Sequence, residues 1–220
     1  MKNSNPILSI ETSGEVCSVA FYKNENDLFE LNFVRKNIHS EKIFDMIEFG
    51  RSNFGIQISD IDSVAVSTGP GSFTGLRIGM TVAKSIAMGL NKPIIPVPTF
   101  DAAAFHLIME LPQNTKFGIL KKASINDFYY AKYLSGVKSY TIVDELQLIL
   151  KEEVEKKAAD ADIVYADNYN LPETRKITAP TALHIAVWAS EFGEKVTDYD
   201  YLEPFYLKKF IARVKNEKND

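Results

Sequence analysis

The chain has 220 residues, of which 45% are hydrophobic and 25% are charged, and its formal net charge is −4. This composition is typical of a folded protein with a sizeable core, and the length allows two compact lobes. Net negative charge argues against a nucleic-acid-binding surface, because phosphate backbones are bound by clustered positive charge. The single cysteine, Cys17, excludes an intrachain disulfide and a cysteine zinc site and is expected in the core. No signal-peptide or membrane-spanning pattern is visible, so a cytoplasmic protein without membrane contact is expected.

The first hundred residues predict the order strand, strand, strand, helix, strand, helix. The apolar runs have strand length and are separated by polar turns, and Ser40 is the expected cap of the first helix. The expected strands are 7–10, 16–21, 27–36 and 62–69, and the expected helices are 41–53 and 72–89.

The second half repeats this order more weakly. Its expected strands are 116–124, 127–135, 139–146 and 161–168, and its expected helices are 145–159 and 179–196. We place the boundary in 91–105, where Pro93, Pro96 and Pro98 are expected to interrupt regular structure. The predicted lobes are 1–100 and 101–220, with the final segment packing back on the first lobe. Two βββαβα lobes resemble the α/β architecture of actin, hexokinase and Hsp70 (ribonuclease H-like), which by itself implies no activity.

A glycine-rich turn precedes the second helix and is typical of phosphate-binding loops. Its glycines let backbone N–H groups approach an anion, Ser72 can cap the helix, and the first hairpin turn adds the carboxylate of Glu11 and two hydroxyls. The alternative is a tight strand-to-helix turn that binds nothing. The matching turn of the second half, 122–126, has no glycine, so a two-sided clamp is only half present. The candidate phosphate-cradling residues are Thr12, Ser13, Gly69, Gly71, Ser72 and Gly75.

Two helices of the first half predict a docking surface. In the second helix, Gly75, Gly79, Ala83 and Ala87 recur every four residues, so one face has little side-chain bulk and allows close approach. In the first helix, Ile43, Phe44, Ile47 and Phe54 form a predicted core stripe, and Met46 and Phe49 point elsewhere. This helix is therefore apolar over a wide arc, which favours an outward-facing patch and a protein partner. The alternative is packing of these faces within their own lobe. The candidate interface residues are His39, Ile43, Met46, Phe49, Leu76, Gly79, Met80, Ala83 and Ala87.

The sequence predicts no catalytic residue and no metal site. The three histidines form no HxxxH or HExxH pair, so structural roles are expected for them. No serine lies in a GxSxG elbow, and no Gly-Lys-Ser/Thr motif closes the glycine turn.

The stretches "ILSIETSGEVCSVAF", "HSEKIFDMIEFG" and "STGPGSFTGLRIGMTVAKSIAMGLNKPIIPVPTFDAAA" resemble the bacterial TsaB (YeaZ) family. The resemblance is dense over the first hundred residues and later reduces to "PFYLKK". It implies a non-catalytic partner of TsaD, which makes N6-threonylcarbamoyladenosine at position 37 of tRNAs that read ANN codons. It also implies docking through the N-terminal-lobe helices, TsaE in a larger complex, a homodimer where TsaD is absent, and contact with tRNA only through the complex.

Departures from the related TsaD pattern oppose catalysis. The His-x-x-x-His metal pair of TsaD-type enzymes falls on Thr99 and Ala103, and the first aspartate of the family is Glu11. No cofactor is therefore predicted, and ATP or ADP at a subunit junction stays an alternative outside the prediction. The rival hypotheses are an ATPase or kinase of the actin-like class, a peptidase, and a self-sufficient homodimer on the same helix face.

Overall fold

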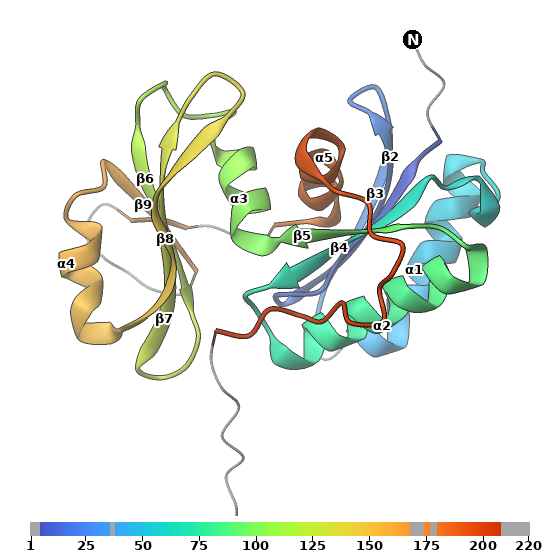
Figure 1. The fold of residues 1–220 in the computed structure, drawn as a ribbon, viewed down its shortest axis with the longest axis horizontal. Helices are drawn as coiled ribbons and strands as arrows, with labels where there is room; N and C mark the ends of the chain where they lie inside the picture. Colours follow the sequence, from blue (N-terminus) through green and yellow to red (C-terminus); the bar gives the residue numbers. More distant parts are fainter. Residues whose placement is uncertain (1–4, 36–37, 168–173, 177–179, 208–220) are drawn as a thin grey trace, which may run out of the picture.

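The structure, a computed structural model, describes residues 5–35, 38–167, 174–176 and 180–207. Two five-stranded mixed sheets lie side by side, each with helices against it (Figure 1). The first sheet has the order β3-β2-β1-β4-β5 and the second the order β10-β9-β6-β7-β8. In the first sheet β1, β2 and β3 pair antiparallel, and β4 and β5 run parallel to β1. In the second sheet β6, β7 and β8 pair antiparallel, and β9 and β10 run parallel to β6. The predicted α/β fold with two repeated sheets is confirmed.

The strands of the first sheet are β1 (Ile7–Glu11), β2 (Val16–Asn24), β3 (Asp27–Val34), β4 (Ser63–Gly69) and β5 (Ile94–Pro98). Those of the second sheet are β6 (Lys116–Lys122), β7 (Asp127–Ser135), β8 (Tyr140–Leu150), β9 (Ile163–Asp167) and β10 (Thr174–Lys176). The helices are α1 (His39–Phe54), α2 (Phe73–Leu90), α3 (Thr99–Leu107), α4 (Val154–Ala158) and α5 (Ala182–Phe192), with 3-10 turns η1 (Ile58–Asp60) and η2 (Lys151–Glu153).

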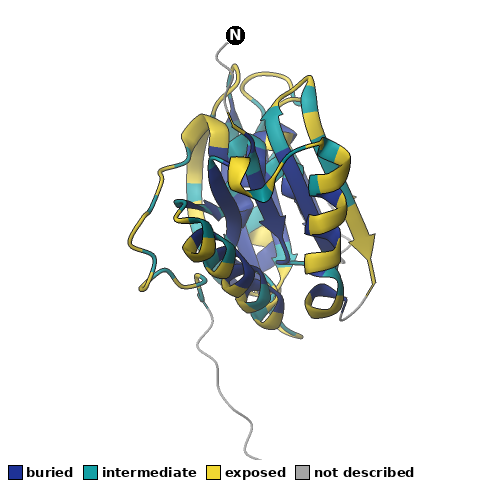
Figure 2. Ribbon diagram, turned by 90° about the vertical axis from the view of Figure 1, so that its right-hand side faces the viewer, coloured by how far each residue is buried: buried dark blue, intermediate teal, exposed yellow. Residues whose placement is uncertain are grey.

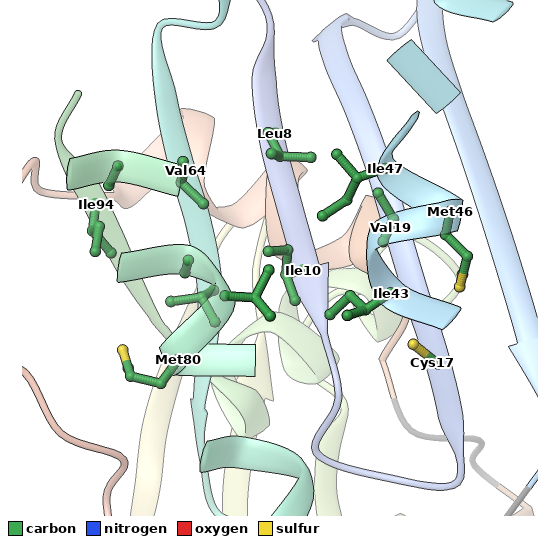
Figure 3. Packing of buried hydrophobic residues seen from close by; sticks show 14 of the residues in the cluster. Leu8, Ile10, Cys17, Val19, Ile43, Met46, Ile47, Val64, Met80 and Ile94 are labelled. Carbon is green, nitrogen blue, oxygen red and sulfur yellow. The ribbon is translucent and has the colours of Figure 1, made fainter. Parts of the chain in front are cut away.

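Helices cover both faces of the first sheet. α1 and α2 lie on one face, α5 lies on the other, and α3 lies between the two sheets (Figure 1). The main core fills the space between the sheet and α1 and α2, where Ile43 and Ile47 lie beside sheet residues such as Leu8 and Ile10 (Figure 3). Cys17 is fully buried in this core, as predicted.

Two predicted elements are wrong. The helix expected over 145–159 is strand β8 up to Leu150, and only α4 within it is α-helical. Leu146 and Leu148 pack in one core cluster and Ile149 in another, because alternate residues of a strand point to opposite faces. The prolines expected to interrupt regular structure lie in and beside β5 instead. Proline has no backbone N–H to donate, but β5 is an edge strand that pairs only with β4 in its sheet, so prolines are tolerated there.

The helix starts also differ from the predicted caps in one of two cases. Ser72 caps α2, since its Oγ accepts a hydrogen bond from the N–H of Gly75 at 3.2 Å. Ser40 does not cap α1, because the helix begins at His39 after Ile38. The last residues of the expected strands 27–36 and 161–168, the first residue of the expected helix 179–196, and residues 208–220 lie outside the described residues.

The C-terminal part of the described chain packs on the first sheet. The N-terminus of α5 is held by Ser9 and Ser18, whose side chains bond the carbonyl and the N–H of Ala182 at 2.7 and 2.8 Å. Further on, the N–H of Phe205 donates to the carbonyl of Thr68 at 2.7 Å. A division of the chain at residue 100 stays a proposal, because α5 belongs to the second half in sequence and contacts the first sheet in space.

Candidate functional site

The glycine turn packs directly against the hairpin turn between β1 and β2. The N–H of Ser72 donates to the carbonyl of Ser13 at 2.8 Å, and Thr12 Oγ1 donates to the carbonyl of Gly75 at 2.8 Å. A Cβ on Gly71 would lie 2.4 Å from the carbonyl oxygen of Ser13, and one on Gly75 would lie 2.0 Å from that of Thr12. These glycines are therefore required for the close approach of two backbone turns of the same chain.

Gly69 is constrained in a second way. Its φ of 109° is a conformation that favours glycine, and its N–H donates to Thr99 Oγ1 at 3.1 Å. The structure thus brings together all six predicted cradle residues, which contact mainly one another and their neighbours in the chain's own fold. This packing accounts for the glycines without a ligand, and phosphate binding by the turn stays a prediction.

The carboxyl ends of β1, β4 and β6 meet at a buried polar centre. Glu11 is fully buried, and its Oε1 accepts a hydrogen bond from the N–H of Ser13. Its Oε2 and the Oγ of Ser67, on the neighbouring strand, have no hydrogen-bond partner among the described residues. Burial raises the pKa of Glu11 above its usual value, although the bonds to Ser13 and the charge of Lys121 oppose this shift.

Lys121 connects the second sheet to the first at this centre. Its Nζ lies 3.2 Å from the carbonyl oxygen of Ser13 and 3.5 Å from the Oγ of the same residue. The carboxyl group of Glu11, the amine of Lys121 and the nearby serine hydroxyls can hold a proton and bind polar groups. Among the described side chains of this centre, none forms a pair of a nucleophile and a histidine base. Sequence reasoning missed Lys121, because its contact with Ser13 joins two halves that are far apart along the chain.

The positions that correspond to the metal pair of TsaD-type enzymes do not fit a metal. Thr99 Oγ1 accepts the N–H of Gly69, and Ala103 has no donor atom. Within the ranges that the structure describes, no cluster of three His, Cys, Asp or Glu side chains could hold a metal ion. No described helix is both long enough and apolar enough to cross a bilayer.

Most of the residues of the predicted docking face are buried within the chain itself, and their contact with a partner stays a prediction. Phe49 is 55% exposed, but the other eight residues are buried: His39, Ile43, Met46, Leu76, Gly79, Met80, Ala83 and Ala87. A Cβ on Gly79 would lie 2.3 Å from Thr12 Oγ1, so the small-residue stripe lets α2 approach its own sheet and hairpin. The buried part of the apolar arc of α1, formed by Ile43, Met46 and Ile47, packs in the same way against its own sheet.

Three other apolar residues are exposed on these helices. Phe44 and Phe49 of α1 are 56% and 55% exposed, and Met88 of α2 is 65% exposed. Sequence reasoning placed Phe44 in the core stripe and missed it. A helical wheel would have found it, because Phe44 lies about 100° around the helix from Ile43. We call Phe44, Phe49 and Met88 the outer apolar residues.

Two of the histidines stack on each other, which sequence spacing did not reveal. The rings of His106 and His184 lie 3.8 Å apart at 28°, joining α3 to α5. His184 Nδ1 accepts the N–H of Thr181 at 3.0 Å, and burial, with a smaller effect of His106, lowers the pKa of His184 to about 4. The third histidine, His39, lies 3.3 Å from the carbonyl oxygen of Val16. Stacked rings do not converge on one metal ion, and these contacts are structural.

Comparison with known proteins gives the family. A model described as "TsaD: tRNA N6-adenosine threonylcarbamoyltransferase" matches residues 34–195. A relative from Haemophilus influenzae, named tRNA threonylcarbamoyladenosine biosynthesis protein TsaB, is 33% identical over 127 residues, which are 57% of this chain and 52% of the relative. The protein of that name from Buchnera aphidicola (subspecies Acyrthosiphon pisum) is 33% identical over 151 residues, 69% of this chain and 67% of the relative. The chain belongs to the TsaB (YeaZ) family.

The TsaB of Escherichia coli is 31% identical over 150 residues, 67% of this chain and 63% of that protein. The matched segments thus span between 52% and 67% of the length of these TsaB relatives. Among solved structures, YeaZ from Pseudomonas aeruginosa has a TM-score of 0.74 at 22% identity, covering 92% of this chain and 100% of that one. A second protein from that species, described as similar to peptidase YeaZ, has a TM-score of 0.77 at 23% identity, with coverage of 93% and 100%. These two likenesses show that the TsaB fold extends over nearly the whole chain.

Proposed function

We propose that this chain is a non-catalytic subunit that binds and activates a TsaD-type transferase in the formation of N6-threonylcarbamoyladenosine at position 37 of tRNAs that read ANN codons. The observation that carries this proposal is the loss of the metal-ligand pattern in a chain that the TsaD family model matches. Thr99 is engaged with Gly69 and Ala103 has no donor, so this chain would need a partner for the chemistry. The names of its TsaB relatives supply the reaction.

The outer apolar residues, Phe44, Phe49 and Met88, support a docking surface on α1 and α2. They replace most of the residues predicted from sequence, which are buried and unavailable to a partner. Gly89 adds a place for close approach, because a Cβ there would meet nothing within 4 Å. An apolar helix surface on TsaD, or a second copy of this chain where TsaD is absent, would bury these side chains and gain roughly 25 cal/mol per Å² of apolar area.

The wider assembly follows from the same proposal. TsaE would join a larger complex, and tRNA would be bound through TsaD because this chain carries net negative charge. The proposed location is the cytoplasm, where tRNA is modified. No cofactor of its own is proposed for the chain.

The proposal is tested by binding to the TsaD of the same organism. Phe44→Glu places a charge on the proposed surface and should weaken binding at least tenfold. Ile125→Glu is the matched control, because Ile125 is 79% exposed and lies in the turn between β6 and β7, outside the two helices of the proposed surface. Equal weakening by both variants, or by neither, would contradict the docking surface. ATP turnover by the purified chain would contradict the non-catalytic role and favour the actin-like ATPase.

A further inference from the structure

Arg77 differs from the other lysine and arginine residues of α1 and α2 in having no polar partner among the described residues. Lys42 and Arg51 pair with carboxylates of their own helix, α1. Lys84 of α2 donates to a backbone carbonyl of the segment after α5, at 3.1 Å. Arg77 is exposed, and within the described part of the chain its guanidinium contacts only an aromatic ring. Its N–H groups are therefore available to another molecule.

The guanidinium of Arg77 is held in place by stacked side chains. Its Cζ lies 4.3 Å from the centre of the Phe73 ring, which belongs to the preceding turn of α2. The Phe73 ring in turn lies 5.0 Å from the ring of Tyr206, at an angle of 40°. Stacking on an aromatic face restricts the arginine side chain and leaves its planar set of N–H donors free to bind. Arg77 is thus oriented before any partner arrives.

Tyr206 belongs to the segment 193–207, which follows α5 and runs back beside α2 (Figure 1). The segment is held at the start of the glycine turn, where the N–H of Phe205 donates to the carbonyl of Thr68 at 2.7 Å. The Tyr206 hydroxyl is buried and has no hydrogen-bond partner among the described residues. The ring of Tyr206, and not its hydroxyl, therefore supports Phe73.

Arg77 lies on the same side of α2 as Met88, one of the outer apolar residues. The two positions are eleven residues apart, which is about 16 Å along the helix and about 20° around it. Figure 2 shows that the helices at the margin of the molecule are exposed on the sides turned away from the strands. Between Arg77 and Met88 the exposed residues are the small Thr81 and Ser85. A partner that covers Met88 can therefore also reach Arg77.

The charge of α2 indicates which chemical group of the partner would meet Arg77. The helix contains Arg77, Lys84 and no aspartate or glutamate, although the whole chain has a net charge of −4. The positive end of the helix dipole adds to the charge near Arg77. A carboxylate fits this position, because its two oxygens accept two parallel N–H bonds from a guanidinium. Nucleic-acid phosphates are bound by several clustered cations, and Lys84 is already engaged.

We propose that Arg77 pairs with an aspartate or glutamate of the TsaD-type partner, and that Tyr206 positions Arg77 through Phe73. This inference rests on the proposed function, because it adds one charged contact to the docking surface of the outer apolar residues. The ion pair fixes the orientation of the partner on α1 and α2. Because the guanidinium is ordered in advance, forming the pair costs little side-chain entropy.

Binding to the TsaD of the same organism, measured by calorimetry at about 0.05 M and about 0.5 M NaCl, tests the ion pair. Arg77→Glu should weaken binding roughly tenfold at the lower salt concentration, and this loss should shrink at the higher one because ions screen the pair. Phe44→Ala removes an apolar contact, so its loss should be similar at both concentrations. Arg175→Glu is the matched control, since it makes the same change of charge at an exposed position in β10.

The positioning role of Tyr206 needs a separate comparison. Tyr206→Ala should weaken binding at low salt about threefold, whereas Tyr206→Phe, which keeps the ring, should bind like the wild type. In the Arg77→Gln variant, Tyr206→Ala should cause no further loss, because it acts through Arg77. Equal losses from Tyr206→Ala with and without Arg77→Gln would overturn the positioning role.

The outcomes separate this inference from the proposed function. Weakening by Phe44→Ala but not by Arg77→Glu would overturn the ion pair and leave the docking surface standing. No binding by the unmodified chain would overturn both. Equal weakening by Arg77→Glu and Arg175→Glu would overturn the ion pair, because it would show an effect of overall charge. Loss of tRNA retention in Arg77→Glu with unchanged TsaD binding would also overturn it, since Arg77 would then bind a phosphate.

Discussion

Replacing Gly79 by alanine is the sharpest test of how α2 sits on the first sheet. The new Cβ would lie 2.3 Å from Thr12 Oγ1 and 3.6 Å from Ile10 Cγ2. Thr12 is not free to turn away, because its Oγ1 donates a hydrogen bond to the carbonyl of Gly75 one turn earlier in the helix. The substitution must therefore move α2 away from the hairpin or break the bond between Thr12 and Gly75.

The expected loss of stability follows from these contacts. Overpacking a buried site costs about 1–3 kcal/mol, and losing the Thr12 hydrogen bond costs about 1 kcal/mol. Alanine returns about 1 kcal/mol through its higher helix propensity. We expect Gly79→Ala to lower the free energy of unfolding by about 1–3 kcal/mol. For a chain of this size, this corresponds to a melting temperature about 2–12 °C lower, measured by circular dichroism together with urea denaturation.

Gly89→Ala is the control in the same helix. A Cβ on Gly89 would meet nothing within 4 Å, so the substitution should leave stability unchanged or raise it by up to about 1 kcal/mol. Thr12→Ala should lower the free energy of unfolding less in the Gly79→Ala variant than in the wild type, because it removes Thr12 Oγ1, the atom that the new Cβ would meet. A Gly79→Ala protein as stable as the wild type would refute the packing described for α2.

Three further outcomes are expected. Ser18→Ala removes the buried acceptor of the Ala182 N–H and should lower the free energy of unfolding by about 1–3 kcal/mol in urea denaturation. Folding lowers the pKa of His184 from 6.5 to about 4, so its contribution to stability is complete above pH 6.5 and is lost as the pH falls towards 4. In His184→Gln the free energy of unfolding should therefore vary less with pH between 6.5 and 4. An unchanged pH dependence in this variant would contradict the assignment. Lys121→Met should speed hydrogen exchange in the β1–β2 hairpin turn, whereas Lys122→Met, at an exposed neighbour, should not; equal exchange in both would contradict the link between the sheets.

The sequence predicted β1, β2, β3 and β4 of the first sheet, because their apolar runs and glycine turns are local signals, and it missed β5, whose prolines were taken as breakers. β8 was mistaken for a helix beyond residue 146, since a short apolar run fits both periods and only pairing with β7 decides between them. The small-residue stripe of α2 has the same ambiguity. Its spacing predicts a face that is closely approached, and only the position of Thr12 beneath Gly79 shows that the chain's own hairpin approaches it.

The candidate site shows a similar limit. The glycine turn and its cap at Ser72 could be predicted, because they lie within a few residues of one another. The contact of Lys121 with Ser13 and the stacking of His106 on His184 join residues from different halves of the chain, which one sequence cannot place together. Phe44 was misplaced for another reason: an apolar residue beside a core stripe was assigned to the core, although it points outward.

The chain is proposed to activate a TsaD-type transferase through the outer apolar residues of α1 and α2. Threonylcarbamoylation of tRNA by the TsaD of the same organism, titrated with wild-type chain and with Phe44→Glu, tests this activation. We expect full activity with the wild type, little without the chain, and at least a tenfold higher concentration of Phe44→Glu for half-maximal activity. Equal activity with both proteins at every concentration, or full activity without the chain, would contradict it.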